Sequence, residues 1–225
     1  MCQFKSAICL KDRVFVPDYD SHSKMLEELH IEDDFAHASK VFVRVELVPE
    51  DDDKTSNVDE WKLNVDQDVL PDWWDENDCL PRIKAAVKVW CNNHILRTGM
   101  HTVRDGIWYA HDNASVEAHG NASVEAFDNA SVGAHGNASV KAFDDASVEA
   151  FDNASVEAFD EASVKAFDNA SVEAFDNASV EAFDEASVKL PKYFQTLKPV
   201  LLHDKAICIN YKDHTIQSPV KWEQK

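Results

Sequence analysis

Basic residues, glycine, proline and cysteine are all scarce in this chain, and each shortage excludes a class of protein. Only 22 Lys and Arg stand against 42 Asp and Glu among 225 residues, which gives a formal net charge of −20. So acidic a chain repels a phosphate backbone, and we expect no direct binding to nucleic acid. The five cysteines are too widely spaced for a disulfide framework. They predict free thiols and a cytoplasmic location.

Long apolar runs and the motifs of common catalytic sites are missing as well. No apolar stretch reaches the ~18 residues of a membrane-spanning helix, and the N-terminal residues lack the apolar core of a signal peptide. The chain has no glycine-rich phosphate loop, no G-x-S-x-G elbow, no H-E-x-x-H and no paired C-x-x-C. We therefore expect no membrane association, no enzymatic activity and no cofactor.

What the sequence has in abundance is an eight-residue repeat, which runs from Asn113 to Leu190. In its commonest form, N-A-S-V-E-A-F-D, two Ala and one Val alternate with Ser and Glu. On a helix an apolar position repeated every eighth residue drifts by about 80° per repeat, whereas this alternation fits a half-buried strand. Pairs such as Asp-Asn and Gly-Asn, which favour turns, follow each strand. The repeat predicts a β-solenoid in which each octad forms one face of a coil.

The repeat also carries most of the negative charge. Between Asn113 and Leu190 there are 16 acids and 3 lysines, a net charge of −13, which leaves −7 of the total −20 for the rest of the chain. Lys141, Lys165 and Lys189 recur in every third octad. This second period fits three octads per coil, which would stack the lysines on one face. It equally fits a coil of two octads that arose by duplication of a three-octad unit.

An aromatic residue or a histidine occupies the seventh position of the octads. The phenylalanines are Phe127, Phe143, Phe151, Phe159, Phe167, Phe175 and Phe183. They can form an exposed stripe that marks a partner surface, or they can fill the core. We expect the inward arrangement, because seven exposed rings would promote aggregation. His111, His119 and His135 share this position, as in solenoid metalloenzymes, but no acid/base partner accompanies them. We interpret them as polar corners of the first coils.

The flanking segments predict two further domains, an α+β domain over 1–104 and a C-terminal cap over 191–225. The solenoid itself is assigned to 105–190, and a hairpin turning at Lys212-Asp213 is expected to close its last coil. Because the segments AICLKDR and AICINYKD are alike, the N-terminal and C-terminal hairpins are candidates to share one sheet.

Within the N-terminal domain, alternating apolar residues predict a hairpin over 2–16 and strands over 40–48 and 61–65. Ser21 or Ser23 is expected to cap a short helix that contains Met25. A second helix is expected to begin at Pro81, with Gly99 as its stop signal.

Possible metal ligands in the flanks match no standard site. Cys79, Cys91 and His94 lack the spacing and the fourth ligand of a zinc site. Acidic clusters at 32–34, 50–53 and 72–78 lack the glycine and the ligand spacing of a calcium loop. We therefore predict no metal site.

The octads and the segment 40–74 resemble those of a loose group of uncharacterised proteins from phages and gut bacteria. Their shared pattern is an α+β head, a stretch like VDQDVLPDW at 65–73, a helix, and tandem octads of the N-A-x-V-x-A-aromatic-D/G type. The resemblance implies the fold and an origin in mobile elements, without an established activity. In shape and charge the chain is also similar to pentapeptide-repeat solenoids that mimic DNA, although their five-residue motif is absent.

The leading functional hypothesis is a non-enzymatic, phage-encoded inhibitor whose carboxylates mimic nucleic acid and bind a basic or nucleic-acid-binding host protein. A purely solubilising role explains the charge almost as well. The alternatives are a self-assembling scaffold, hence a homo-oligomer, and a solenoid that binds a metal or a small molecule. The expected partner-binding residues are Glu117, Glu125, Asp128, Glu149, Asp152, Glu157, Asp160, Glu173, Asp176, Glu181 and Asp184.

Overall fold

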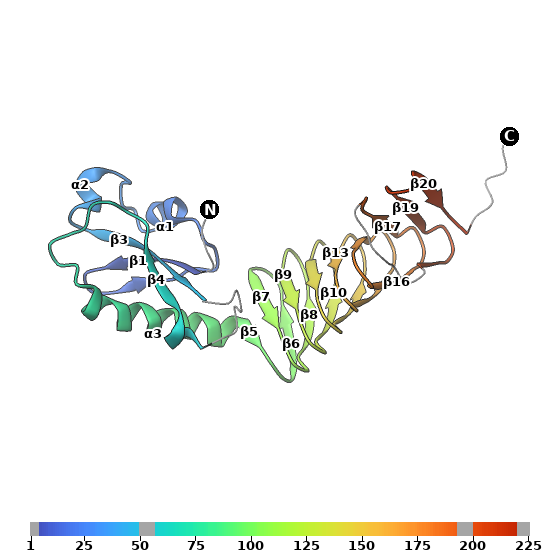
Figure 1. Ribbon diagram of the computed structural model, residues 1–225, viewed down its shortest axis with the longest axis horizontal. Helices are drawn as coiled ribbons and strands as arrows, with labels where there is room; N and C mark the ends of the chain where they lie inside the picture. The colour runs from blue at the N-terminus through green and yellow to red at the C-terminus, as the bar shows by residue number, and fades with distance from the viewer. Residues whose placement is uncertain (1–4, 50–56, 193–199, 220–225) are drawn as a thin grey trace. The chain divides into compact units, whose positions relative to one another are not determined.

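The computed structural model describes residues 5–49, 57–192 and 200–219 and divides the chain into two units, 1–94 and 95–225 (Figure 1). An α+β region is followed by a β-solenoid that ends in a strand hairpin, as the sequence predicts. The second unit begins at residue 95 rather than 105 because β5 (Ile95–Leu96) and β6 (Met100–Val103) already pair with solenoid strands.

The N-terminal unit contains a four-stranded antiparallel sheet of order β2-β1-β3-β4. Its strands are β1 (Lys5–Leu10), β2 (Val14–Phe15), β3 (Phe42–Val48) and β4 (Lys62–Val65). The predicted N-terminal hairpin and both predicted strands are present. Ile8 and Phe42 pack with Met25 and Leu26 of the first helix in a core of large side chains.

The helical segments in the described part of this unit are α1 (His22–Glu28), α2 (Phe35–Ala38), a 3₁₀ turn (Val58–Glu60) and α3 (Glu76–His94). Ser21 caps α1 by accepting a hydrogen bond from the Lys24 amide, as expected. The prediction that the long helix begins at Pro81 is wrong. The Asp75 carboxylate accepts the Asn77 amide at 2.9 Å and starts the helix earlier, so that Pro81 lies inside α3.

The octads form two parallel sheets that alternate along the chain (Figure 1). One contains β7 (Ile107–Ala110), β9 (Ser123–Ala126), β11 (Ser139–Ala142), β13 (Ser155–Ala158), β15 (Ser171–Ala174) and β17 (Ser187–Leu190). The other contains β8 (Ser115–Ala118), β10 (Ser131–Ala134), β12 (Ser147–Ala150), β14 (Ser163–Ala166) and β16 (Ser179–Ala182). Ser131 pairs with Ser147, the equivalent residue two octads later, so one coil contains two octads. The alternative of three octads per coil is therefore wrong.

The solenoid core is made of small side chains from every octad. The second, fourth and sixth residues, Ala, Val and Ala, are at most 2% exposed, and Leu190, at the sixth position of the last octad, is 8% exposed. The phenylalanines are half-buried and lie outside this core cluster. The expectation that they turn inward is wrong, because each lies just beyond its four-residue strand and the close-packed Ala and Val leave no space for a ring.

The last coils end in β18 (Leu201–Leu202), β19 (Ile207–Asn210) and β20 (Thr215–Gln217). The antiparallel pair β19–β20 is the predicted C-terminal hairpin. It extends the nine-stranded solenoid sheet, so the idea that it shares a sheet with the N-terminal hairpin is wrong. Most of the segment 193–202 lies outside the described residues. Among the residues that are described, no helix has the length and apolar character needed to cross a membrane.

Candidate functional site: the acidic rows of the solenoid

The solenoid carries two kinds of acidic residue, which differ in position and in environment. We call the residues at the fifth octad position the face glutamates, because they lie in the strands: Glu117, Glu125, Glu149, Glu157, Glu173 and Glu181. We call those at the eighth position the corner aspartates, because they lie in the turns: Asp112, Asp128, Asp144, Asp152, Asp160, Asp168, Asp176 and Asp184.

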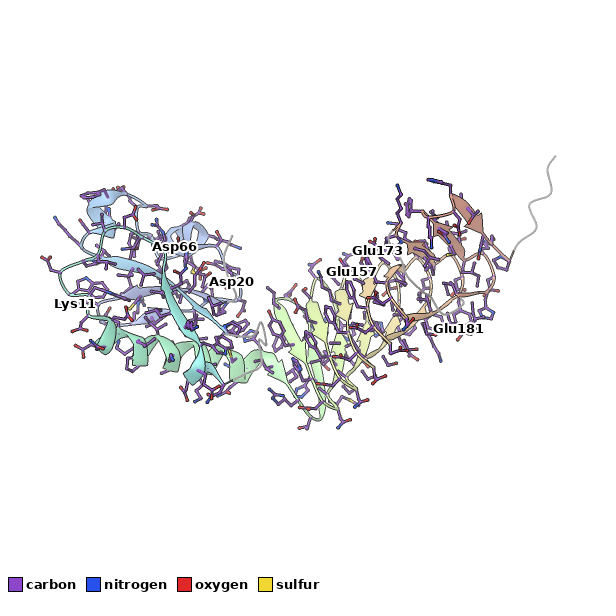
Figure 2. The ribbon with its side chains drawn as sticks, in the orientation of Figure 1. Lys11, Asp20, Asp66, Glu157, Glu173 and Glu181 are labelled. Atoms are coloured by element: carbon purple, nitrogen blue, oxygen red, sulfur yellow. The ribbon has the colours of Figure 1, made fainter. Side chains whose placement is uncertain are left out.

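Lysines interrupt the rows of face glutamates. On the nine-stranded sheet Lys141 pairs in register with both Glu125 and Glu157, and its ammonium lies 3.3 Å from the Glu157 carboxylate. Lys189 is in register with Glu173 in the same way. Figure 2 shows Glu157 and Glu173 on neighbouring strands, the directly opposed like-charged pair of this row.

The seven-stranded sheet has the same arrangement. Lys165 is in register with Glu149 on one side and Glu181 on the other. Lysines recur every three octads, whereas a coil contains two octads. Successive lysines therefore lie on alternate sheets. The stack of Lys141, Lys165 and Lys189 that a coil of three octads would give does not exist, and nearly every face glutamate has a lysine beside it.

Glu117, the first face glutamate, is compensated differently. Its register partner is Gly133, where the other octads have Glu or Lys. A Cβ added at Gly133 would lie 2.6 Å from Oε2 of Glu117, so the Glu117 carboxylate would have to leave its present position. The glycine lets Glu117 reach across the strand to His135, whose Nε2 lies 3.1 Å from Oε2.

The corner aspartates form ladders along the turns. Their backbone φ angles lie between 48° and 57°, a left-handed conformation that Asp, Asn and Gly tolerate. At six places along these ladders, Oδ2 of a corner aspartate accepts a hydrogen bond from the backbone N–H of the equivalent residue one coil earlier. The N–O distances are 3.0–3.5 Å. Asp152, for example, accepts from Gly136 and donates its own N–H to Asp168. These ladders fix the carboxylates in straight rows.

The rows run along two edges of the solenoid. The first edge carries Asp112, Asp128, Asp144, Asp160 and Asp176, one from every second turn. The second carries Gly120 and Gly136 followed by Asp152, Asp168 and Asp184, so it becomes acidic only after its first coils. Additional turn acids, Asp145 and Glu161 on the first edge and Glu185 on the second, reinforce both rows.

Most of the net charge of the repeat belongs to these edges. Between residues 113 and 190 the turns contribute ten of the 16 acids and no lysine or arginine, whereas the faces contribute six glutamates and all three lysines. The flanks supply some compensation, because Arg97 pairs with Asp112 at 3.2 Å and Lys205 with Glu185 at 2.8 Å. A hydrogen bond from Lys205 lowers the pKa of the Glu185 carboxyl.

Each acidic edge has a stack of rings beside it. On the first edge His111, Phe127, Phe143, Phe159 and Phe175 stack with centroids 4.5–5.0 Å apart and interplanar angles of 7–11°. On the second, His119, His135, Phe151, Phe167, Phe183 and His203 do the same at 4.5–5.0 Å. Since the ring faces cover one another, they offer little surface for cation–π contacts. The carboxylates of the turns, rather than the ring faces, therefore define the chemical character of each edge.

The eleven predicted partner-binding residues divide between the two kinds. Glu117, Glu125, Glu149, Glu157, Glu173 and Glu181 are the compensated face glutamates, whereas Asp128, Asp152, Asp160, Asp176 and Asp184 belong to the corner rows. The prediction omitted Asp112, Asp144, Asp168, Asp145, Glu161 and Glu185, which occupy the same turns. Their shared octad positions could have identified them, because the turn acids outnumber the turn bases in the sequence itself.

Other candidate ligands are not brought together in this way. Cys79, Cys91 and His94 all lie in α3, and among the described residues they belong to no cluster of three candidate ligands with converging atoms. A shallow, polar hollow of about 370 Å³ lies at the second edge, lined by Asp184, Glu185, Asp204 and Lys205 among others.

Comparison with known proteins supplies no family. Neither a family model, nor a curated protein, nor a solved structure matches the chain.

Proposed function

We propose that the solenoid is a non-enzymatic interaction module whose corner aspartates bind a basic surface of another protein, in place of the phosphates of a nucleic acid. The target class is a nucleic-acid-binding protein, and the biological setting suggested by the octad pattern is inhibition of a host defence protein by a phage. The observation that carries the proposal is the pair of turn edges, where fixed carboxylates recur in rows and the turns between residues 113 and 190 contain no lysine or arginine.

The spacing of the first edge supports this proposal. Successive coils are about 4.8 Å apart, and the stacked rings beside the acids have the same spacing. Seven acids from Asp112 to Asp176 then give roughly one charge per 3 Å, against ~3.4 Å per charge along one DNA strand. Because the ladders hold the carboxylates in place before binding, little side-chain entropy is lost when a partner docks.

The first test neutralises equal numbers of charges at the two kinds of position. One variant carries Asp128→Asn, Asp144→Asn, Asp160→Asn and Asp176→Asn, changes that keep an acceptor oxygen and tolerate the left-handed turn. The matched control carries Glu125→Gln, Glu157→Gln, Glu173→Gln and Glu181→Gln. Partners captured from a bacterial lysate on the full-length protein are identified, and their affinities are then measured at low and high salt with duplex DNA as competitor.

We expect the corner variant to bind at least tenfold more weakly at low salt, with a smaller salt dependence, whereas the face variant binds nearly normally. Competing duplex DNA should displace the partner, because the two ligands occupy the same basic surface. If both variants weaken binding equally, net charge alone explains the binding and the corner aspartates have no special role. A partner that duplex DNA does not displace would contradict the mimicry.

A self-assembling scaffold remains the second candidate, favoured by apolar residues at the C-terminal end of the solenoid. Leu201 in β18, Tyr211 after β19 and Ile216 in β20 are 55%, 46% and 70% exposed. Light scattering of the unmodified chain and of Ile216→Lys tests this role. A concentration-dependent oligomer that the substitution dissolves would support it, whereas a monomer at all concentrations would contradict it.

A further inference from the structure

A second cluster of ligand-type side chains lies in the N-terminal unit, apart from the repeat. His22 at the start of α1, Glu46 in β3 and Asp66, which directly follows β4, each direct one nitrogen or oxygen toward the others. These three atoms all lie within 4.8 Å of one another. The residues are far apart in sequence, and the pairing of β3 with β4 brings two of them together. Figure 2 labels Asp66 at this position.

The hydrogen bonds of His22 define which ring nitrogen faces the cluster. Its Nε2 lies 3.1 Å from the backbone carbonyl oxygen of Val45, and a carbonyl can only accept, so Nε2 carries a hydrogen. The other nitrogen, Nδ1, lies 3.2 Å from Oδ2 of Asp66. In the neutral ring this places a nitrogen lone pair against a carboxylate. The contact is stable only with a cation between the two groups or with a second proton on the ring.

Burial makes a shared cation the more effective compensation. Glu46 is 4% exposed and His22 is 6% exposed. The hydrogen-bond donor that Glu46 receives is the neutral amide of Asn64, at 3.0 Å. Among the described residues this amide is the donor to Glu46, and a buried carboxylate with one neutral donor is costly to desolvate. A proton on His22 would have to serve two carboxylates at once. Asp66, by contrast, is 58% exposed and leaves the cluster open to solvent.

We propose that His22, Glu46 and Asp66 bind one divalent transition-metal ion of the Zn²⁺ class. One imidazole and two carboxylates suit such an ion, and ligand atoms about 2.0–2.2 Å from zinc stand about 3.4 Å apart, close to the observed His22–Asp66 separation. The outer partners of a metal site are present too: a metal-bound histidine ordinarily donates its other N–H to a carbonyl, and ligating carboxylates are themselves hydrogen-bonded. The ion would fasten α1 to β3 and to the end of β4, with its open side toward solvent.

The neighbouring cluster of Glu32, Asp34 and His37 serves as a built-in comparison. Asp34 caps α2, and its Oδ1 accepts both the backbone N–H and the ring Nδ1 of His37 at 2.8 Å. Glu32 and Asp34 are exposed, so solvent compensates their charges. Helix capping accounts for the Asp34–His37 contacts, and Glu32 is exposed to solvent, so this cluster carries no metal proposal.

The test is calorimetric titration of the chelator-stripped, full-length protein with Zn²⁺ at high salt, which screens loose ion binding by the acidic solenoid. We expect His22→Gln and Glu46→Gln each to weaken the tight site at least tenfold, and Asn64→Leu to weaken it roughly 10–100-fold through the lost outer hydrogen bond. The matched control, His37→Gln, should bind Zn²⁺ as the unmodified protein does. Zinc binding that survives all three substitutions, or the absence of a tight site, would overturn the proposal.

A second measurement decides the question even where a substitution prevents folding. Nitrogen NMR of the unmodified protein distinguishes the two ring atoms of His22. With Zn²⁺ in excess we expect Nδ1 to shift to a metal-bound position while Nε2 keeps its hydrogen. Two protonated ring nitrogens in excess zinc would show an imidazolium paired with carboxylates and would refute the metal site.

Discussion

The two units of this protein build their cores in opposite ways. In the N-terminal unit, large side chains such as Leu26 and Phe42 come from separate elements and are fully buried in one cluster. In the solenoid, Ala and Val repeat in every coil, and each strand meets neighbours almost identical to itself. From this comparison we expect stability to be concentrated in a few residues in the first unit and distributed over many equal contacts in the second. Three experiments test this difference, in order of decreasing expected effect.

The largest effect is expected from truncating the N-terminal core. Leu26→Ala should lower the free energy of unfolding of this unit by about 2–5 kcal/mol, because a fully buried side chain leaves a cavity. Val148→Ala in the solenoid removes less apolar surface and should cost about 1–2 kcal/mol. Urea unfolding, followed by the fluorescence of Trp61 and Trp90 and by the far-UV circular dichroism of the solenoid strands, measures both. Similar losses in the two units would contradict the comparison.

A single corner aspartate should matter more for its backbone than for its charge. Asp152→Val places a β-branched residue at a φ of 57° and removes the hydrogen bond from the Gly136 amide, so we expect a loss of about 2–3 kcal/mol. Asp152→Asn keeps both features and should change stability by less than about 0.5 kcal/mol. Thermal unfolding of the solenoid distinguishes the two. If the Asn variant is destabilised as strongly as the Val variant, the ladder depends on charge.

Alkaline pH should weaken the N-terminal unit before the solenoid. Burial raises the pKa of Cys9 to about 12 and that of Cys91 to about 11, from an ordinary value of 9.0. The contribution of these two buried thiols to the stability of the N-terminal unit is fully present below pH 9. It falls as the pH rises from 9 toward 11–12, because the unfolded thiols ionise while the native ones stay protonated. Each thiol should cost on the order of 1 kcal/mol between pH 9 and 10.

Urea unfolding of the N-terminal unit at several pH values measures this slope, and the Cys9→Ala, Cys91→Ala double variant is its control. The control should lose the sensitivity between pH 9 and 10, below the range in which Tyr19, with its pKa raised to about 12, contributes. The solenoid, where burial raises the pKa of Cys208, should show a shallower slope. An unchanged slope in the double variant would assign the effect to other groups.

Local patterns in the sequence predicted the strands, turns and hairpins correctly, because alternation and turn residues act over a few positions. The coil size was not predictable in this way, since an octad has the same pattern whether two or three of them close a coil. It determines which acids share a row, so the division into face glutamates and corner aspartates emerged only from the strand register. Pro81 is a poor guide to the start of α3, because the carboxylate of Asp75 caps the helix six residues earlier. The His22, Glu46 and Asp66 cluster depends on long-range strand pairing and has no local signal.

The mismatch between a coil of two octads and a chemical repeat of three restricts how this protein can change length. Gain of one three-octad unit adds an odd number of octads, so every following strand would move to the opposite sheet. β19 would then no longer lie in the sheet that it now extends. Gain of two units restores the original sides. An insertion that keeps both the cap and the lysine pattern must therefore contain an even number of three-octad units. Insertion of a single coil, which is two octads, keeps the cap in place but disturbs the alternation of charge.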